Sequence, residues 1–296
     1  MDVFMTGASG WIGSAAVPEL LAAGHRIRGI ARSSAAAEKL REAGVEPVGG
    51  DLDNLAVLRE EAARAEAVLH LANKHDWSNP AESNRAERAA VHTFVTTLEG
   101  SGKPFLFASG VALTPGRVLT EVDPNPFSGP DAPRGGAEAL ATEYAARGVH
   151  TVSLRFAPTV HGTGGDHGFI ALIARAARER GVSAYVGDGT NRWTAVNRLD
   201  AGRLVALALD KAPGGSVVHA VAEEAVTSRT IAEAIGAALG LTVVSVAPDR
   251  AVDHFGWIGS FFALDIPASA AITRERLGWL RTHPTLAEDI SVGAYT

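Results

Sequence analysis

Short apolar runs alternate with longer segments in which apolar residues recur every three or four positions throughout the first half of the chain. Runs of the first kind predict buried strands, and segments of the second kind predict amphipathic helices. The predicted strands are Asp2–Thr6, Arg26–Ala31, Val45–Gly49, Ala67–Leu71, Pro104–Ala108 and Val149–Phe156. The predicted helices are Trp11–Ala23, Ala35–Ala43, Leu55–Arg64, Asn84–Glu99 and Gly135–Arg147. This alternation favours an α/β fold with a doubly wound parallel sheet.

The second half keeps the alternation but is less regular. Helices are predicted at Phe169–Arg180, Leu199–Asp210 and Ser228–Leu239, and a strand at Ser216–Ala220. The proline-rich segment Leu113–Pro133 is predicted to be a loop. We therefore expect residues 1–160 to form a dinucleotide-binding domain. Residues 161–296 would form mainly a smaller C-terminal α/β substrate lobe, with segments that return to the first domain.

Composition narrows the class of protein. The 296 residues and 30.7 kDa suit one large or two modest domains. A formal net charge of −6 and a pI near 5.9 argue against binding to nucleic acid. No apolar run approaches the ~18–20 residues of a membrane helix. The absence of cysteine excludes disulfides and thiolate sites, and the N-terminus does not resemble a signal peptide. We expect a cytoplasmic protein.

Three glycines follow the first predicted strand and open the first predicted helix. Gly7 would permit a tight turn, Gly10 would let the backbone approach a pyrophosphate, and Gly13 would let the helix pack close to the strand. The free N–H groups and the positive end of the helix would then face the phosphates. A glycine-rich turn without a ligand is the alternative. The complete strand–turn–helix–strand unit favours dinucleotide binding.

The end of the second predicted strand indicates which dinucleotide binds. An NAD site usually has an acidic residue there to bind the ribose hydroxyls, whereas Gly29–Ser34 contains none. Arg32 can instead pair with a 2′-phosphate, which favours NADP(H), although it could also be a solvated charge. Asp51 and Leu52 follow the third strand, where an adenine edge would lie. Asp51 could alternatively cap the next helix.

The spacing T-G-x-x-G-x-x-G at Thr6–Gly13 is accompanied by further motifs along most of the chain. They are Gly50–Leu52, His70–Ala72, Arg155–Gly162, Gly187–Asp200 and Leu277–Trp279. Together they resemble the extended short-chain dehydrogenase/reductases, also called the NAD-dependent epimerase/dehydratase family. The resemblance implies a Rossmann fold. With the arguments above, it predicts that cofactor contacts come from Gly7, Ser9, Gly10, Trp11, Ile12, Gly13, Arg32, Asp51, Leu52, Leu71, Ala72, Asn73, Arg134, Pro158 and Val160.

The catalytic signature of that family, Tyr-x-x-x-Lys, is absent. Tyr144 and Tyr185 are followed four residues later by Gly148 and Gly189, and Tyr295 stands too near the end of the chain. The family signature therefore implies a proton donor that this sequence lacks.

The residues that normally surround the signature are partly present. Arg134 and Glu138 match the lysine and the acid that continue the family motif, which puts Pro130 in the place of the tyrosine. Arg134 could still bind the nicotinamide ribose but is too basic to titrate. Ser109, after the fifth predicted strand, is the candidate for the helper serine.

Three histidines stand at or just beyond predicted strand ends, where a doubly wound sheet has its crevice. His161 takes the place of a family tyrosine and is the predicted proton donor, with His75 as a second catalytic candidate. His167 is a candidate for substrate contact, as are Trp77 and Trp193, which could line an apolar pocket. Surface histidines and core tryptophans are the alternatives. The spacing does not fit a metal site, so no metal is expected.

The function expected from these features is NADP(H)-dependent reduction of a carbonyl or imine in a small, apolar substrate. The missing tyrosine favours an imine, since a protonated iminium needs no acid at an oxygen. Two alternatives are a non-catalytic NADP(H)-binding sensor and a sugar-nucleotide epimerase or dehydratase. The expected partner is a small-molecule substrate, with neither nucleic acid nor membrane involved and with a homodimer as an open alternative.

Overall fold

The computed structural model describes residues 1–76, 78–111 and 114–296, so the predicted substrate residue Trp77 lies outside the described residues. The chain separates into two compact units. The first unit comprises Met1–Ser109, Pro124–Arg155 and Gly202–Val218. The second unit comprises Gly110–Asp123, Phe156–Ala201 and His219–Thr296. The sequence analysis places a boundary at residue 160 between a dinucleotide-binding and a substrate-binding part. That assignment of functions to the two parts stays a prediction.

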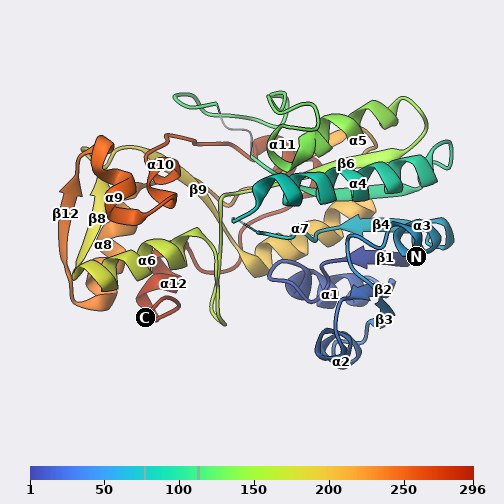
Figure 1. Ribbon diagram of the computed structural model, residues 1–296, viewed down its shortest axis with the longest axis horizontal. Helices are drawn as coiled ribbons and strands as arrows, with labels where there is room; N and C mark the ends of the chain where they lie inside the picture. The colour runs from blue at the N-terminus through green and yellow to red at the C-terminus, as the bar shows by residue number, and fades with distance from the viewer. Residues whose placement is uncertain (77, 112–113) are drawn as a thin grey trace. The chain divides into compact units, whose positions relative to one another are not determined.

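A seven-stranded sheet, to which the first unit contributes most, has the order β10-β6-β5-β4-β1-β2-β3 (Figure 1). In chain order its strands are β1 (Asp2–Thr6), β2 (Arg26–Ala31), β3 (Glu46–Gly49), β4 (Ala67–His70), β5 (Pro104–Gly110), β6 (His150–Phe156) and β10 (Ser216–Ala220). β1 lies parallel to both β2 and β4, and the strand order reverses between β1 and β4. The predicted doubly wound α/β fold is confirmed. In such sheets, ligands bind at the carboxyl ends of the strands where the order reverses.

The α-helices of this unit are those expected, and all except Leu55–Arg64 have shifted ends. They are α1 (Gly13–Ala22), α2 (Ser34–Glu42), α3 (Leu55–Arg64), α4 (Pro80–Leu98), the short 3-10 helix η1 (Pro133–Gly136), α5 (Ala137–Ala145) and most of α7 (Arg198–Lys211). α4 begins four residues earlier than predicted, because the Asn79 side chain accepts a hydrogen bond from the Glu82 N–H and Pro80 occupies the first turn.

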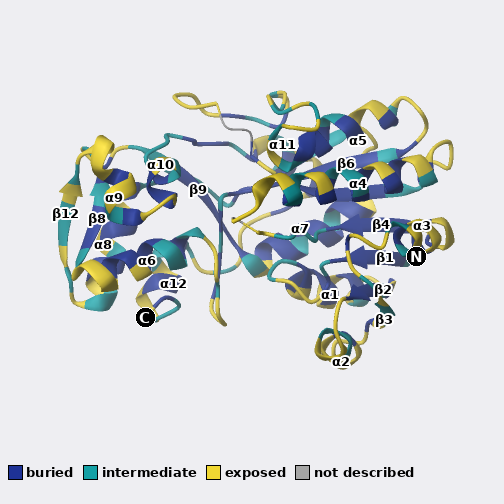
Figure 2. Ribbon diagram, in the orientation of Figure 1, coloured by how far each residue is buried: buried dark blue, intermediate teal, exposed yellow. Residues whose placement is uncertain are grey.

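The core of the first unit lies between the sheet and its helices. Figure 2 shows β1 and β4 as buried along most of their length, as their sequences of apolar residues require. Phe94 on α4 packs against Phe4 and Phe105 with ring centroids 6.2 and 5.6 Å apart. These contacts hold the long helix α4 against the sheet.

The second unit contains short strands that the sequence analysis does not predict. β11 (Glu223–Thr227), β9 (Arg192–Asn197) and β7 (Thr159–His161) form one sheet, and β12 (Thr242–Val246) pairs in parallel with β8 (Val182–Val186). The helices and 3-10 turn are α6 (Phe169–Arg180), α8 (Ser228–Leu239), η2 (Pro248–Arg250), α9 (Ala251–Phe255), α10 (Ile258–Phe262), α11 (Ala271–Leu277) and α12 (Leu286–Ser291). Among the described residues, no helix combines the length and the apolar character of a membrane span.

Candidate dinucleotide site and its polar networks

The glycine-rich turn of the first unit is packed too tightly for other residues. Gly7 has a φ of +76°, and a side-chain carbon there would lie 2.7 Å from the Ala72 nitrogen at the end of β4. A side-chain carbon at Gly13 would collide with the Gly7 carbonyl oxygen. Glycine is therefore required at both positions, because the turn brings α1 close to β1 and β4.

The start of α1 leaves backbone donors unused. The Gly10 N–H donates to the Gly7 carbonyl oxygen at 2.9 Å, but within the described part of the chain the N–H groups of Ile12 and Gly13 have no acceptor. Ser9 and Gly10 are exposed, and Trp11 and Ile12 are half-buried. Unpaired N–H groups at a helix N-terminus beside an exposed turn fit a dinucleotide pyrophosphate.

Arg32 is exposed directly after β2. It makes no hydrogen bond or ion pair with any residue that the structure describes, so its guanidinium is available to a phosphate. Asp51 does not cap α3; its Oδ1 atom accepts hydrogen bonds from the N–H groups of Asp53 and Asn54 in the preceding turn. Leu52 is buried. Their contact with an adenine stays a prediction.

The ends of β1 and β4 are joined by a buried threonine and histidine. The Thr6 hydroxyl lies 2.7 Å from His70 Nδ1 and accepts a hydrogen bond from the Ala72 N–H at 3.3 Å. Leu71, Ala72 and Asn73 are half-buried in the segment that follows β4. Thr6 also precedes Gly7, so this pair fixes the glycine-rich turn relative to the end of β4.

A carboxylate that the sequence analysis does not single out lies at the centre of this network. The Glu87 side chain, on α4, is fully buried and accepts hydrogen bonds from Arg134 Nη2 at 2.6 Å and Asn73 Nδ2 at 3.0 Å. His70 Nε2 lies 3.8 Å from Glu87 Oε2. Burial raises the pKa of Glu87, but the charge of Arg134 and the contact with His70 outweigh it and hold the pKa at about 2. Glu87 is thus the counter-charge that fixes Arg134.

Arg134 itself has a strained backbone. Its φ is 55°, in the left-handed region, and Gly135 and Gly136 continue that conformation. The Arg134 N–H donates to Asn84 Oδ1 at 2.9 Å, and Arg88 Nη1 donates to the Gly135 carbonyl oxygen at 2.7 Å. α4 therefore holds this turn from both sides, and α5 begins at Ala137 instead of the predicted Gly135.

Two of the predicted catalytic residues of the first unit also have defined neighbours. His75 has a φ of 49°, and its pKa is lowered by partial desolvation of the imidazole and by the charge of Arg134. Ser109 is 5% exposed at the end of β5, and its hydroxyl donates to Glu138 Oε2 at 2.5 Å. Pro130, in the place of the family tyrosine, is exposed. The catalytic roles of Ser109, Arg134 and His75 stay predictions.

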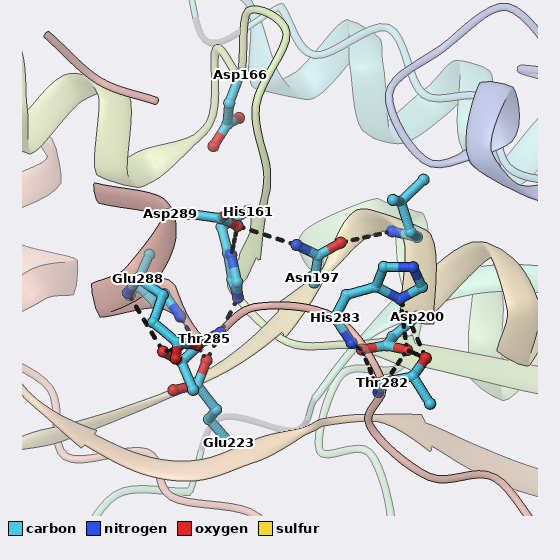
Figure 3. A network of polar contacts seen from close by, with 12 residues as sticks. His161, Asp166, Asn197, Asp200, Glu223, Thr282, His283, Thr285, Glu288 and Asp289 are labelled. Atoms are coloured by element: carbon cyan, nitrogen blue, oxygen red, sulfur yellow. Dashed lines mark hydrogen bonds and ion pairs between the residues drawn. The ribbon is translucent and has the colours of Figure 1, made fainter. Parts of the chain in front are cut away.

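His161, in the second unit, has a different environment from the one that the sequence analysis supposes. The ring is fully buried; Nδ1 lies 2.6 Å from Asp289 Oδ2, and Nε2 lies 3.4 Å from Glu223 Oε1 (Figure 3). Asn197 Nδ2 also donates to Asp289 at 3.0 Å. Burial lowers the pKa of His161, but the hydrogen bond to Asp289 and the nearby carboxylate of Glu223 outweigh it and raise the pKa. Its role as proton donor stays a prediction.

The other predicted residues of the second unit lie in separate surroundings. Pro158 and Val160 flank the start of β7 and are half-buried, and His167 is exposed. Trp193 is 1% exposed and its ring packs edge-on against Phe262, with centroids 5.1 Å apart. The interior of the second unit thus holds Trp193 in the aromatic core. No group of three potential metal ligands comes together among the described residues.

The doubly wound sheet and the glycine-rich turn with unpaired helix donors define a dinucleotide-binding protein of the Rossmann type. A sequence model of the NAD dependent epimerase/dehydratase family matches residues 3–221. The chain therefore belongs to this family, as the motif resemblance predicts.

Individual relatives agree with this assignment. The chain is 41% identical to the uncharacterized protein C2A9.02 of Schizosaccharomyces pombe over 297 residues, which cover both chains in full. It is 26% identical to the 4-hydroxy-2-methyl-3-oxo-4-farnesyl-3,4-dihydroquinoline-1-oxide ketoreductase of Stigmatella aurantiaca over 226 residues, 73% of this chain and 67% of the relative. The solved structure of MoeE5 in complex with UDP-glucuronic acid and NAD is 25% identical, with a TM-score of 0.73 over 98% of this chain and 97% of that one.

The sequence analysis does not single out Glu87 or His70 as functional residues. Glu87 follows Ser83 and Ala86 and precedes Ala90 on the buried face of α4. A charged residue inside an apolar stripe of a helix is the signal that could have identified it, because such a residue requires a buried partner.

Proposed function

We propose that the chain is an NADP(H)-dependent reductase that transfers a hydride to the carbonyl or imine carbon of a small, apolar substrate. The observation that carries the proposal is the exposed Arg32 at the end of β2, which forms no ion pair with any residue in the described ranges and lies in a segment without an acidic residue. The ketoreductase among the relatives supports reduction as the type of reaction. Bound NADPH would supply the hydride.

The residues of the first unit would have distinct tasks. The N–H groups of Ile12 and Gly13 would bind the pyrophosphate, and Arg32 the 2′-phosphate. Arg134 is fixed by Glu87 and by Asn84, so its remaining guanidinium donors are preorganised for a ribose hydroxyl. Arg134 cannot release a proton at neutral pH, so it binds and orients and does not act as the acid.

Cofactor titration tests the dinucleotide preference. We expect wild-type protein to bind NADPH about tenfold to a hundredfold more tightly than NADH, as charge-assisted hydrogen bonds to a phosphate imply. Arg32→Asp should abolish the preference. Arg26→Asp, at the other end of the same strand and exposed, is the matched control and should keep it. Equal affinities in the wild type would contradict the proposal.

A turnover screen tests the reaction. NADPH oxidation is followed with ketones, aldehydes and cyclic imines, and at least one class should be reduced. Tight NADPH binding with no turnover on any of them would instead favour a non-catalytic sensor. Conversion of a sugar nucleotide without net consumption of NADPH would favour an epimerase or dehydratase.

A further inference from the structure

His161 is connected to both ends of the short helix α12 (Figure 3). On one side of the ring, Nδ1 lies 2.6 Å from Asp289 Oδ2, near the end of the helix. On the other side, Nε2 lies 3.4 Å from Glu223 Oε1. The same Glu223 oxygen accepts the N–H of Leu286, the first residue of the helix, at 2.8 Å. One buried imidazole therefore contacts both points at which α12 is attached.

Carboxylates face this imidazole from three different segments. Asp289 comes from α12, Glu223 from β11, and Asp166 from the segment after β7, where the charges of Asp166 and His161 interact. The strand β9 contributes Asn197, which donates to Asp289 but carries no charge. Within the described ranges, no lysine or arginine forms an ion pair with Asp289 or Glu223. The proton on His161 is therefore the positive charge that offsets these carboxylates.

The tail that follows α12 is attached to the same group of acids. The Tyr295 hydroxyl donates to Asp166 Oδ2 at 2.6 Å, and Asp166 Oδ1 accepts the N–H of Gly168 at 2.7 Å. Asp166 thereby joins the tail to the glycine-rich segment 162–168, which is mostly exposed. His167, in that segment, is the other imidazole whose charge acts on Asp166. Release of the tail would therefore also free this segment.

The attachment of α12 depends on a balance of two contributions. A helix of six residues does not persist alone in water, so α12 needs its contacts with the rest of the unit. Leu286 and Ile290 supply apolar contacts, since each is 1% exposed in the core of the second unit. Loss of the His161 proton would leave the buried Asp289 carboxylate without a counter-charge, which opposes docking.

We propose that residues 286–295 form a proton-sensitive strap, which docks on β7, β9 and β11 while His161 carries a proton and loosens when that proton is lost. The strap needs no cofactor, so the inference is independent of the proposed reductase function.

The direction of the pH dependence follows from the docked state. Because the pKa of His161 is raised there, docking is complete below the ordinary imidazole pKa and is lost as the pH rises through the raised value. Each unit of that rise corresponds to about a tenfold change in the ratio of docked to loosened strap.

A nitroxide label on the strap tests the proposal. The chain contains no cysteine, so Val292→Cys, at a position 71% exposed directly after α12, takes a single label. In electron paramagnetic resonance spectra, we expect the mobile fraction of this label to grow as the pH is raised from about 6 to about 9, a range that spans imidazole titration. Val252→Cys on α9 of the same unit, 51% exposed, is the matched control and should show no change.

Two variants in the labelled protein assign the change to His161. His161→Gln removes the titrating group, so the spectrum should no longer depend on pH. Asp289→Asn removes the nearer carboxylate and leaves Glu223, so the midpoint of the change should move to lower pH. Asp253→Asn, which alters an exposed carboxylate on α9, is the matched control and should leave the midpoint where it is.

Three results would overturn the strap. The first is a spectrum of the Val292→Cys label that does not change over this pH range. The second is an equal change at Val252→Cys, because the whole unit would then be loosening. The third is an unshifted midpoint in Asp289→Asn. If His161→Gln does not fold, the midpoints of the wild-type background and of Asp289→Asn decide the question.

Discussion

His70 and His161 are both fully buried, one in each unit, and both lie near a carboxylate from a helix, but the carboxylates are balanced differently. In the first unit, Glu87 has Arg134 at 2.6 Å, and His70 Nε2 stands 3.8 Å away. In the second unit, Asp289 bonds directly to His161, and no arginine or lysine among the described residues forms an ion pair with it. The imidazole there is itself the counter-charge.

The difference shows why similar residues serve different purposes. An arginine is charged at every working pH, so the ion pair of Glu87 with Arg134 keeps both of its charges near neutral pH. An imidazole gains and loses its charge near neutral pH, so the network around Asp289 changes strength with pH. Four experiments test this difference between the two units.

The largest effect is expected from Glu87→Gln. The variant leaves the donors of Arg134, Asn73 and His70 around an uncharged amide. We expect a loss of about 3 kcal/mol in the free energy of unfolding, which is the lower end of the range for breaking a buried ion pair. The lower end applies because Arg134 is 32% exposed and can turn to solvent. Urea unfolding measures it. Glu82→Gln on the exposed face of α4 is the control and should cost much less, because its ion pairs are exposed to solvent. Equal losses for the two variants would refute a special role for Glu87.

A smaller loss is expected from Thr6→Val. The valine keeps the shape but leaves the buried His70 Nδ1 without its partner at 2.7 Å, which should cost about 1–3 kcal/mol. Thr159→Val in the second unit is the matched control. Thr159 is equally buried, and its hydroxyl has no hydrogen-bond partner among the described residues, so its replacement should be close to neutral in the same urea experiment. A costly Thr159→Val would show that buried shape, and not the hydrogen bond, determines the loss.

His161 should contribute to the pH dependence of stability. Because its pKa is raised in the folded protein from a reference of 6.5, its contribution is complete below about pH 6.5 and is lost as the pH rises through the raised value. Each unit of that rise is worth about 1.4 kcal/mol. The free energy of unfolding of the wild type, minus that of His161→Gln, should therefore decrease as the pH rises across this range. Parallel profiles would contradict the assignment.

The smallest expected effect is the difference between the two carboxylates in how far each raises the pKa of His161. Asp289 lies at 2.6 Å and Glu223 at 3.4 Å with 18% exposure. Asp289→Asn should therefore lower the imidazole pKa more than Glu223→Gln does. The midpoint of the His161 resonance in an NMR pH titration reports both shifts. The reverse order would mean that Glu223, which also accepts the Leu286 N–H, is the dominant partner.

Much of the fold follows from local pattern. The bounds predicted for Arg26–Ala31, Leu55–Arg64, Phe169–Arg180 and Ser228–Leu239 are those of β2, α3, α6 and α8. Gly181 and Gly240 end the last two helices in the left-handed conformation, a stop signal that a sequence displays directly. The short strands of the second unit carry no comparable signal, because their pairing partners lie far away in the chain and their residues are only partly apolar.

The sequence likewise predicted some of the features of the candidate site and not others. The amino-acid order alone was sufficient for the glycine-rich turn, the NAD-dependent epimerase/dehydratase motifs and the missing tyrosine, because each is a property of neighbouring residues. It could not show that Glu87 fixes Arg134, that Ser109 donates a hydrogen bond to Glu138, or that His161 is enclosed by Asp289 and Glu223. Those partners are 47, 29, 128 and 62 residues apart. A buried polar group must find a partner wherever packing brings one, so only the tertiary structure decides which donors and acceptors remain for a ligand.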